Sequence, residues 1–440
     1  MSETVVPPGV RRRHAHDRQD GRVRALLTAC VGNTLEWFDW LVYAQFAALL
    51  ATRFFPADSG SAALLGTLAI FGVGFFFRPL GGIVLAALAD RRGRRTGLVV
   101  SMSMMAAGAL IIGLAPSYGT VGLLAPLLLV LARALQGMST GGEYAGAATY
   151  LAEYAPPGRR GRYGSLFYVS SSLGALAAIG VSLLLAAVLT TEQLNAWGWR
   201  LPFLLGGLLG VVALVMRRRM GETQAFTEAR ERRVAAAAPP SGARVLVREH
   251  KADLLRIVVI AGATGVWYYT FASYLPVYLQ GRGLPAGQAL AAGAVALVLM
   301  TVALPAVGIL SDRIGRRPLL LAFSVVATLG AVPLFAWLEP TFGSQILVQT
   351  VALLGFGLYA AIGPVVMAEQ FPTEVRALGA GLPYGLGLAL FGGTAPLLIE
   401  WLADIGAGPV FPWYLAGLAA LMLVATLTLR DRPTEDLRRV

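Results

Sequence analysis

Few residues of this 440-residue chain can ionise or bind a metal. Only 14% are charged, and there are three histidines and one cysteine, Cys30. A single cysteine excludes an internal disulfide. His14, His16 and His250 lie outside every long apolar run, so no histidine pair can form a metal site there. The sequence also lacks the HExxH motif and the phosphate-binding GxxxxGK motif. We therefore expect no metal, no cofactor and no enzymatic activity.

Apolar residues are abundant instead, at 56% of the chain and a mean hydropathy of +0.66. Runs of about 20 apolar residues suit membrane-spanning helices, since a barrel strand would be about half as long and would alternate in polarity. We predict an all-α membrane protein with twelve transmembrane helices in two pseudo-symmetric bundles of six. The expected spans are 25–50, 61–88, 97–115, 121–146, 164–189, 200–216, 255–280, 286–310, 318–338, 344–368, 377–402 and 409–429.

Lysine and arginine are distributed unevenly between these spans. The two tails and the even-numbered loops hold 30 of the 36, whereas the odd-numbered loops hold only Arg53, Arg200 and Arg282. Positively charged loops stay in the cytoplasm, so both termini are predicted to be cytoplasmic, in a bacterial-type plasma (inner) membrane. The net charge of +12 is thus a consequence of topology, and no nucleic-acid partner is expected. The first span is expected to act as an uncleaved signal anchor.

Two motifs occur twice, close to half a chain length apart. The stretch 90–95, DRRGRR, returns as DRIGRR at 312–317, which is 222 residues later. The second motif returns 216 residues later: Glu153, Pro156 and Arg160 recur as Glu369, Pro372 and Arg376. Two repeated motifs at similar offsets indicate an internal duplication of one membrane module. The expected units are a tail 1–24, a bundle 25–216, a cytoplasmic linker 217–254, a bundle 255–429 and a tail 430–440.

Several stretches resemble a known family. Residues 82–95 and 133–137 are similar to the cytoplasmic-loop and fourth-helix motifs of the major facilitator superfamily. Other stretches resemble its metabolite:proton symporter family, namely 32–39, 78–82, 141–144, 197–203 and 391–394. Within that family, 269–271 and 371–379 look most like the α-ketoglutarate permeases. The resemblance covers nearly the whole chain and implies a two-bundle transporter.

The repeated loop motif predicts a closure on the cytoplasmic side. A carboxylate where a helix leaves the membrane can hold an arginine or face the N-terminus of a helix in the opposite bundle. The resemblance implies that it latches this side shut, although the arginines around it can also serve only to fix topology. The predicted gate residues are Asp90, Arg94, Asp312, Arg316, Glu143, Glu153 and Glu369; Glu143 can alternatively bond only to its neighbouring loop.

The first bundle contains charges deep within its spans. Glu36 lies about 12 residues, or ~18 Å, into the first span, and Asp39 and Tyr43 follow on the same helical face. Arg133 lies at a comparable depth in the fourth span, which makes Glu36 a plausible partner, and Gln136 lies one turn further along. Such charges are costly in hydrocarbon and mark substrate or proton pathways.

We expect proton coupling through Glu36, Asp39 and Arg133. A carboxylate paired with arginine stays ionised, whereas an anionic substrate that captures the arginine leaves the carboxylate free to take up a proton. The alternative is a static buried ion pair that only fixes helix packing. Arg78 is expected near the cytoplasmic end of the second span, at ~27 Å depth, where it can reach the headgroups. It either contacts substrate or forms a structural pair.

The second bundle offers aromatic residues where the first offers charge. Trp267, Gln349 and several tyrosines fall within its spans, and these can supply hydroxyl hydrogen bonds and an aromatic wall to a substrate. Some can equally serve packing or interface belts. The predicted substrate-binding residues of the whole chain are Arg133, Arg78, Tyr43, Gln136, Tyr268, Tyr269 and Tyr384.

The predicted function is proton-coupled uptake of a small organic anion, such as a dicarboxylate or α-ketoglutarate, by a monomer that alternates access between two bundles. The alternatives are a symporter of citrate, shikimate, an aromatic acid or proline/betaine, and a proton-driven efflux antiporter of the same fold. A membrane-embedded transferase fits less well, because no catalytic constellation accompanies the spans. A channel would be distinguished by currents far above the turnover of a carrier.

Overall fold

A computed structural model describes residues 30–56, 60–92, 94–156, 158–218, 246, 248–372 and 375–429. Within these residues the chain is helical and has no β-strand, which confirms the expected all-α class. In this part of the chain ten helices are long and apolar enough to cross a membrane, and a bent pair, Thr191–Gly198 with Arg200–Val215, gives an eleventh if it is counted as one span. The first span is helical over 30–45 and continues in α2; its start lies outside the described residues.

The observed helices follow the expected spans closely. In the first half they are α2 (Ala47–Phe54), α3 (Ser61–Arg92), α4 (Arg94–Leu114), α5 (Tyr118–Val121), α6 (Leu124–Tyr154), α7 (Arg160–Val188), α8 (Thr191–Gln193), η1 (Leu194–Gly198) and α9 (Arg200–Arg218). In the second half they are α12 (Lys251–Tyr268), η2 (Tyr269–Tyr274), α13 (Leu275–Gln280), α14 (Ala286–Ile314), α15 (Arg317–Ala336), α16 (Phe342–Ala360), α17 (Gly363–Glu369), α18 (Arg376–Gly387), η3 (Leu388–Gly392), α19 (Ala395–Asp404), η4 (Gly408–Val410) and α20 (Phe411–Leu427).

Several helices extend beyond the apolar run that predicted them. Helix α6 ends at Tyr154, eight residues after the expected boundary at 146, and α3 reaches Arg92. Hydropathy marks where the chain leaves the hydrocarbon, whereas the helix ends only where its backbone hydrogen bonds end. The charged residues of the cytoplasmic motifs are therefore partly helical.

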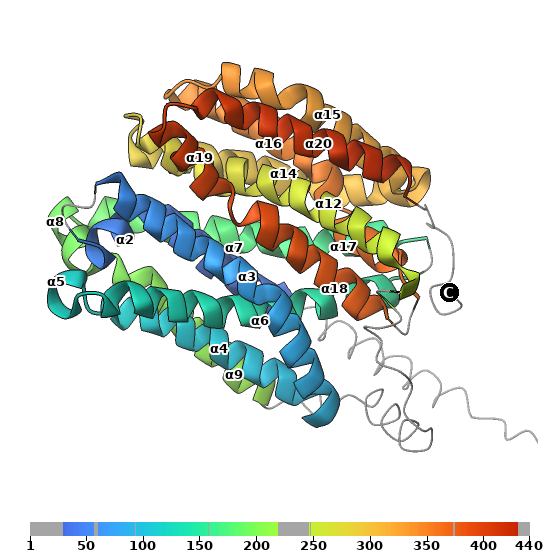
Figure 1. The fold of residues 1–440 in the computed structure, drawn as a ribbon, viewed down its shortest axis with the longest axis horizontal. Coiled ribbons are helices and arrows are strands. Elements are labelled where there is room, and N and C mark those ends of the chain that lie inside the picture. The colour runs from blue at the N-terminus through green and yellow to red at the C-terminus, as the bar shows by residue number, and fades with distance from the viewer. Residues whose placement is uncertain are drawn as a thin grey trace, which may run out of the picture.

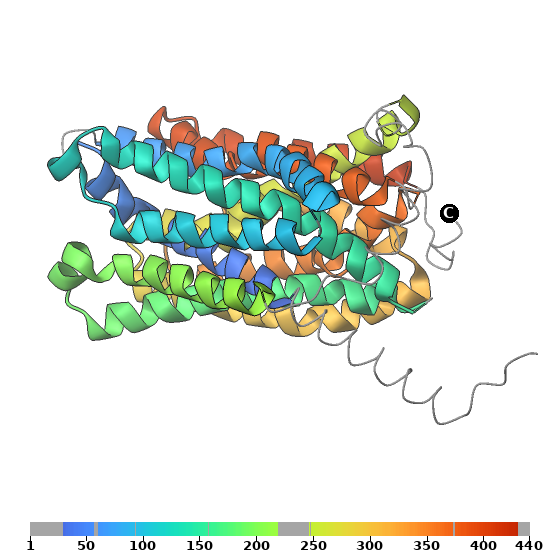
Figure 2. The ribbon, with the colours of Figure 1, turned by 90° about the horizontal axis from the view of Figure 1, so that it is seen from below.

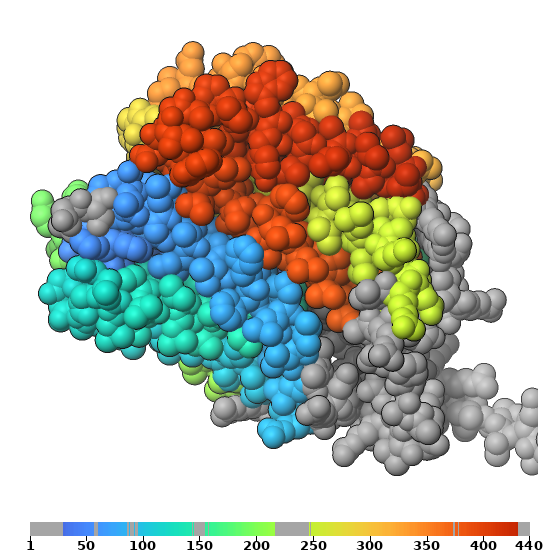
Figure 3. All heavy atoms as spheres, viewed as in Figure 1, coloured from blue at the N-terminus to red at the C-terminus, as the bar shows by residue number. Residues whose placement is uncertain are grey.

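The helices lie side by side along the long axis of the molecule (Figure 1). In the first half α3 packs against α6, and α4 packs against both α6 and α9; in the second half α12 packs against α18 and α20, and α14 packs against α16. Seen from below, the first half lies in front of the second (Figure 2). The halves meet where α7 contacts α14 and where α3 and α6 contact α18, a seam that is visible between α3 and α18 in Figure 3.

Glycines bring α3 and α6 into close contact. A Cβ atom on Gly137 would lie 1.9 Å from the backbone oxygen of Gly74, and one on Gly141 would lie 1.8 Å from that of Arg78. No side chain fits at such distances, so the glycines permit the backbones to approach as small residues do in membrane helices. This contact places Arg78 of α3 and Arg133 of α6 in neighbouring turns.

Proline interrupts the spans that face the first bundle. Pro276, Pro364 and Pro396 each stand at the first positions of the segment after a break, in α13, α17 and α19. Proline has no backbone N–H, so the preceding turn loses a hydrogen bond and rearranges. The π-helical turns η2 and η3 lie just before two of these breaks, in the seventh and eleventh spans. Such turns often occur at functional sites.

Candidate functional site

Arg133 is the centre of a buried polar cluster in the first half. Its side chain is 0% exposed, and its Nη1 lies 3.4 Å from Oδ2 of Asp39 and donates to Oε1 of Gln136 at 2.8 Å. Gln136 is one turn along α6, so its amide reaches the same guanidinium. Helix α6 and the first span together fix the geometry of this ion pair.

Asp39 is the carboxylate that pairs with Arg133 in the structure, at 3.4 Å, whereas the sequence singled out Glu36. Depth alone made the two carboxylates equivalent, because they lie three residues apart on one helical face. Glu36 is also buried, at 7% exposure.

Aromatic rings enclose the guanidinium of Arg133. Its Cζ atom lies 3.7 Å from the centroid of Trp40, 4.6 Å from that of Tyr43 and 5.3 Å from that of Phe71. Cation–π attraction to desolvated rings offsets part of the cost of burying the charge. Tyr43 also donates its hydroxyl to the backbone oxygen of Thr67 at 3.0 Å, which holds the ring in place.

Arg78 belongs to the same cluster, and the expectation that it reaches the lipid headgroups is wrong. It is 4% exposed, and its Cζ lies 4.4 Å from the centroid of Trp40 and 4.2 Å from that of Phe75. Its side chain packs against these rings inside the protein instead of extending along α3 toward the headgroups. Arg78 is therefore in the interior, beside Arg133.

The cluster has more hydrogen-bond donors than acceptors. Among the described residues, four of its buried nitrogen atoms have no hydrogen-bond partner: Nε of Arg78, Nε and Nη2 of Arg133, and Nε2 of Gln136. Oδ1 of Asp39 is a buried acceptor that also has no hydrogen-bond partner among these residues. Buried donors normally find partners, and guanidinium groups prefer carboxylates. The arrangement is suited to a small anion.

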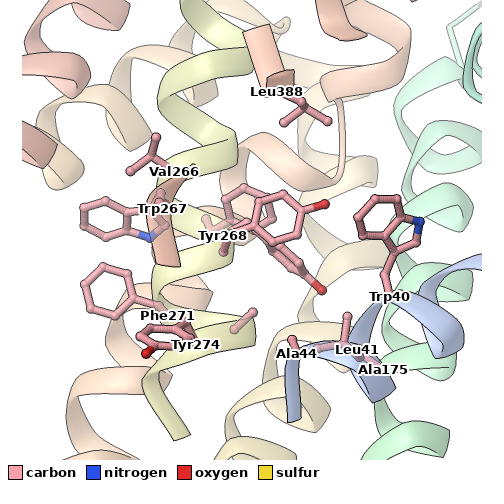
Figure 4. Packing of buried hydrophobic residues seen from close by; sticks show 14 of the residues in the cluster. Trp40, Leu41, Ala44, Ala175, Val266, Trp267, Tyr268, Phe271, Tyr274 and Leu388 are labelled. Atoms are coloured by element: carbon pink, nitrogen blue, oxygen red, sulfur yellow. The ribbon is translucent and has the colours of Figure 1, made fainter. Parts of the chain in front are cut away.

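Tyrosines of the second half complete the cluster on its other side. Tyr269 stacks with Trp37 at 6.3 Å and meets Phe75 edge-on at 4.9 Å, and Tyr268 meets Trp37 edge-on at 5.1 Å. Figure 4 shows Tyr268 of α12 and Trp40 of the first span on opposite sides of this region. The hydroxyls of both tyrosines are buried with no hydrogen-bond partner in the described part of the chain.

Two other polar residues of the second half have contacts of a different kind. Tyr384 stacks face to face on Tyr144 of α6, with ring centroids 3.6 Å apart and planes at 8°, so it joins the two halves. The amide nitrogen of Gln349 donates to the backbone oxygen of Phe271 at 2.7 Å, within the broken part of the seventh span. Gln349 thus satisfies the backbone that the π-turn exposes.

A second charged cluster joins the halves at the start of α7. Asp312 accepts from the backbone N–H of Gly161 at 2.7 Å and of Arg162 at 3.1 Å, the first residues of that helix, and pairs with Arg316 at 3.2 Å. Glu369 pairs with Arg160 at 3.4 Å and with Arg316 at 3.6 Å. A carboxylate at a helix N-terminus is stabilised by the helix dipole. These contacts link α14 and α17 to α7.

Of the predicted gate residues, the structure brings together Asp312, Arg316 and Glu369. The side chains of the others lie outside the described residues: Asp90, Arg94, Glu143 and Glu153. Arg160 also belongs to this cluster and was missed. Its signal was the repeated motif that it shares with Glu153 and Glu369, because an echoed arginine beside an echoed glutamate indicates a pair. In the described part of the chain, no group of three His, Cys, Asp or Glu residues could hold a metal ion.

Comparison with known proteins identifies the architecture. The family model of the Major Facilitator Superfamily matches residues 29–335 and 291–439. The chain belongs to the major facilitator superfamily. It is accordingly a membrane transporter and not an enzyme, as the sequence predicted, and its helices and bacterial relatives make it a multi-pass inner-membrane protein.

Curated relatives cover nearly the whole of this transporter. The α-ketoglutarate permease of Escherichia coli K12 is 36% identical over 435 residues, which are 98% of this chain and 99% of the permease. The citrate-proton symporter of Klebsiella pneumoniae is 38% identical over 422 residues, 93% of this chain and 92% of the symporter. The proline/betaine transporter of Escherichia coli K12 is 31% identical over 439 residues, 95% of this chain and 86% of that transporter. These relatives confirm the resemblance to metabolite:proton symporters.

Solved structures share the fold at low sequence identity. The proton:xylose symporter XylE bound to 6-bromo-6-deoxy-D-glucose has a TM-score of 0.76 at 16% identity, covering 94% of this chain and 98% of that chain. The inward open conformation of XylE from E. coli has a TM-score of 0.71 at 16% identity, covering 95% and 98%. The two-bundle arrangement of the superfamily is thus confirmed.

Proposed function

We propose that this transporter takes up a small organic anion together with protons, by alternating access between bundles 25–216 and 255–429, with the linker and both termini in the cytoplasm. The observation that carries this proposal is the buried ion pair of Arg133 with Asp39, set among donor atoms that have no other partner in the described residues. A site of this composition favours an anion. Relatives named as an α-ketoglutarate permease and a citrate-proton symporter support this class.

Proton coupling follows from competition for Arg133. While Asp39 is paired, its carboxylate is stabilised as the anion. A substrate carboxylate that binds Arg133 weakens this pairing and leaves Asp39 buried beside a second negative charge, which favours proton uptake by Asp39. Glu36, one turn away on the same helix and also buried, is proposed to pass the proton between the site and the second half.

The substrate is proposed to contact residues of both halves. Arg133, Arg78, Tyr43 and Gln136 belong to the first half and provide charge and amide donors. Tyr268 and Tyr269 belong to the second and provide buried hydroxyls. Tyr384 is proposed to act at the edge of the site, where it stacks on Tyr144, so that its contact with Tyr144 must change whenever the site opens toward the cytoplasm.

The cluster of Asp312, Arg316 and Glu369 is proposed to latch the cytoplasmic side, together with Asp90, Arg94, Glu143 and Glu153. Each observed contact of Asp312 with α7 crosses the seam between the halves. Opening this side requires that these contacts break, so they weight the conformational equilibrium toward the closed arrangement.

The test is transport into proteoliposomes by the purified protein. An inward proton gradient should drive uptake of radiolabelled α-ketoglutarate or citrate, and an uncoupler should abolish it. Arg133→Ala should lose uptake, whereas Arg282→Ala, an exposed arginine stacked on Tyr278, should retain it. Undiminished uptake by Arg133→Ala would remove the anion-site proposal. Proton-driven extrusion with no uptake would identify an efflux antiporter instead.

A further inference from the structure

We propose that the second half binds a chain of buried water molecules beside the π-turn η2, and that this chain carries the coupled proton from the outer end of the protein to the first half. The inference rests on the proposed function, because the proton that the chain delivers is the one that Glu36 and Asp39 are proposed to take up. It assigns a water-binding site and a proton route to helices α14 and α16 and to η2.

Unpartnered hydroxyl groups cluster at η2 and at the residue before it. Among the described residues, five of these hydroxyls are buried and have no hydrogen-bond partner: Tyr268, Tyr269, Thr270, Ser273 and Tyr274. Each of the five residues is at most 2% exposed. Buried polar groups are normally paired, and ordered water is the partner where protein atoms do not reach. From Tyr269 to Tyr274 the turn extends over about 8 Å at helical rise, a distance that about three hydrogen-bonded waters span.

Two glutamines of α16 supply further polar atoms next to this turn. Nε2 of Gln349 donates to the backbone oxygen of Phe271 at 2.7 Å. Nε2 of Gln345 donates to the backbone oxygen of Ala289 at 2.8 Å and to Oε1 of Gln349 at 3.0 Å. Oε1 of Gln345 is buried and accepts no hydrogen bond within the part of the chain that the structure describes. The glutamines and the turn therefore form one polar region that offers both donors and acceptors to water.

A glycine of α14 faces the amide of Gln349. A Cβ atom on Gly293 would lie 3.4 Å from Nε2 and 3.7 Å from Oε1 of that amide, which is ordinary van der Waals contact. Gly293 thus leaves this side of the amide uncovered, so that a water molecule can reach it. A methyl group in the same place would cover the amide without a clash.

The glutamines lead from the turn to the outer end of the second half. Gln345 lies three residues after Phe342, the first residue of α16, or about 5 Å along the helix. The loop before α16 is an odd-numbered one, which the charge distribution predicts to be outside. Gln349 lies one turn deeper, beside η2. Water that enters near Gln345 can therefore reach the turn along α16.

The hydroxyls lie on both sides of the seventh span (Figure 4). Tyr268 lies on the side toward Trp40 of the first span, and Tyr274 lies on the opposite side with Phe271. The backbone oxygen of Phe271 accepts from Gln349, so this opposite side faces α16. A chain along the turn therefore leads from α16 around the span to the first half.

Tyr269 brings the end of the chain to the first half. Its ring stacks on Trp37 at 6.3 Å between centroids and meets Phe75 at 4.9 Å, and Trp37 is the chain neighbour of Glu36. Each oxygen of the chain accepts a proton from its outer neighbour and gives its own proton to its inner neighbour. One proton moves in this way, and every hydroxyl and water stays neutral. The carboxylate of Glu36 accepts the proton and becomes a neutral carboxylic acid.

The experiment separates proton delivery from substrate exchange in proteoliposomes. Gly293→Ala places a methyl group against the Gln349 amide and so keeps water from it. Gly357→Ala is the matched control, since Gly357 is also buried in a helix of the second half, but a Cβ there would meet only the side chains of Met300 and Leu304, at 3.6 and 3.9 Å.

We expect Gly293→Ala to slow the proton-driven uptake of labelled α-ketoglutarate at least about fivefold, because the loss of one water interrupts a hydrogen-bonded chain. Gly357→Ala should change this rate less than about twofold, because a space with apolar walls holds no water. Counterflow needs no net proton transfer and should be retained in both variants. The solvent deuterium isotope effect on uptake should increase only in Gly293→Ala, where proton delivery becomes the slow step.

Equal uptake rates in folded Gly293→Ala and Gly357→Ala would overturn the inference and leave the proposed function standing. Loss of counterflow together with uptake in Gly293→Ala alone would also overturn it, because the methyl group would then disturb the conformational change itself. If the unchanged protein takes up no organic acid, the proposed function fails, and the inference fails with it.

A second pair of variants tests the chain without adding volume. Ser273→Ala removes one of the unpartnered hydroxyls. Ser324→Ala is its control, since Ser324 is similarly buried but donates to the backbone oxygen of Leu320 at 2.7 Å. Ser273→Ala should slow proton-driven uptake and retain counterflow, and Ser324→Ala should do neither harm. Should Gly293→Ala not yield folded protein, equal uptake by the two serine variants would overturn the inference.

Discussion

Replacing Asp39 by asparagine separates binding from coupling at the proposed site. The substitution keeps the size and an acceptor oxygen near Nη1 of Arg133 but removes the negative charge that competes with substrate. At 3.4 Å and an effective dielectric constant of about 20, the attraction between the two charges is about 5 kcal/mol. The net effect of the substitution on substrate binding is smaller than this attraction. Asparagine still accepts a hydrogen bond from Arg133, and the burial of the Asp39 charge already costs free energy in the unchanged protein.

We therefore expect Asp39→Asn to bind an anionic substrate more tightly, by about 1–3 kcal/mol, or roughly 5- to 150-fold in Kd. Exchange of substrate across the membrane should persist, because both bundles can still alternate. Accumulation against a gradient should be lost, because no carboxylate at this position can take the proton. Glu36→Gln is the companion variant and should lose accumulation with a smaller gain in affinity, because Asp39 makes the ion pair with Arg133 at 3.4 Å.

The measurements are substrate titration by calorimetry, counterflow in preloaded proteoliposomes, and uptake driven by a proton gradient. A folded Asp39→Asn protein that binds more weakly, or that still accumulates substrate, would refute the competition between Asp39 and the cargo. Loss of both counterflow and binding would assign the ion pair to helix packing. The thermal unfolding midpoint of each variant shows whether the fold survives.

Two further predictions concern the scaffold. Gly141→Leu should destabilise the contact of α3 with α6 by more than about 3 kcal/mol, because even a Cβ there would overlap the backbone oxygen of Arg78. A lower thermal unfolding midpoint checks this prediction. Gly119→Ala is the control, because Gly119 has open space around it. Asp312→Asn should weaken the latch on α7 and increase labelling of cysteines introduced on the cytoplasmic side of the seam. Unchanged labelling would show that these contacts do not hold that side closed.

Much of the fold follows from the sequence because membrane helices obey a strong local rule. Every span must satisfy its own backbone and present apolar side chains over about 20 residues, so the twelve runs could be marked in advance. The breaks could be anticipated less well. Pro276 signals an interruption, but the π-turn before it depends on Gln349, which donates to the exposed oxygen of Phe271 from another helix.

The site shows the same division between local and long-range information. Helical spacing placed Asp39 and Tyr43 on one face and Gln136 one turn from Arg133, and the structure has these residues around one guanidinium. The sequence singled out Glu36 where the structure pairs Asp39 with Arg133, and it did not foresee that the Arg78 side chain packs against Trp40. Both depend on the relative positions of α3, α6 and the first span along their axes. Glycine contacts between the helices decide these positions, and the spacing of residues in the sequence does not reveal them.

The two charged clusters are connected through the same helices. Tyr144 lies on α6, the helix of Arg133, and stacks on Tyr384 of α18; its hydroxyl also lies 3.3 Å from the sulfur of Met367 on α17. Helix α17 carries Glu369 of the latch. A change in charge at Arg133 that shifts α6 must therefore disturb the contacts of Tyr144 with α17 and α18. This provides a mechanical route from the competition at Asp39 to the opening of the cytoplasmic side, and it requires only rigid helices and packed rings.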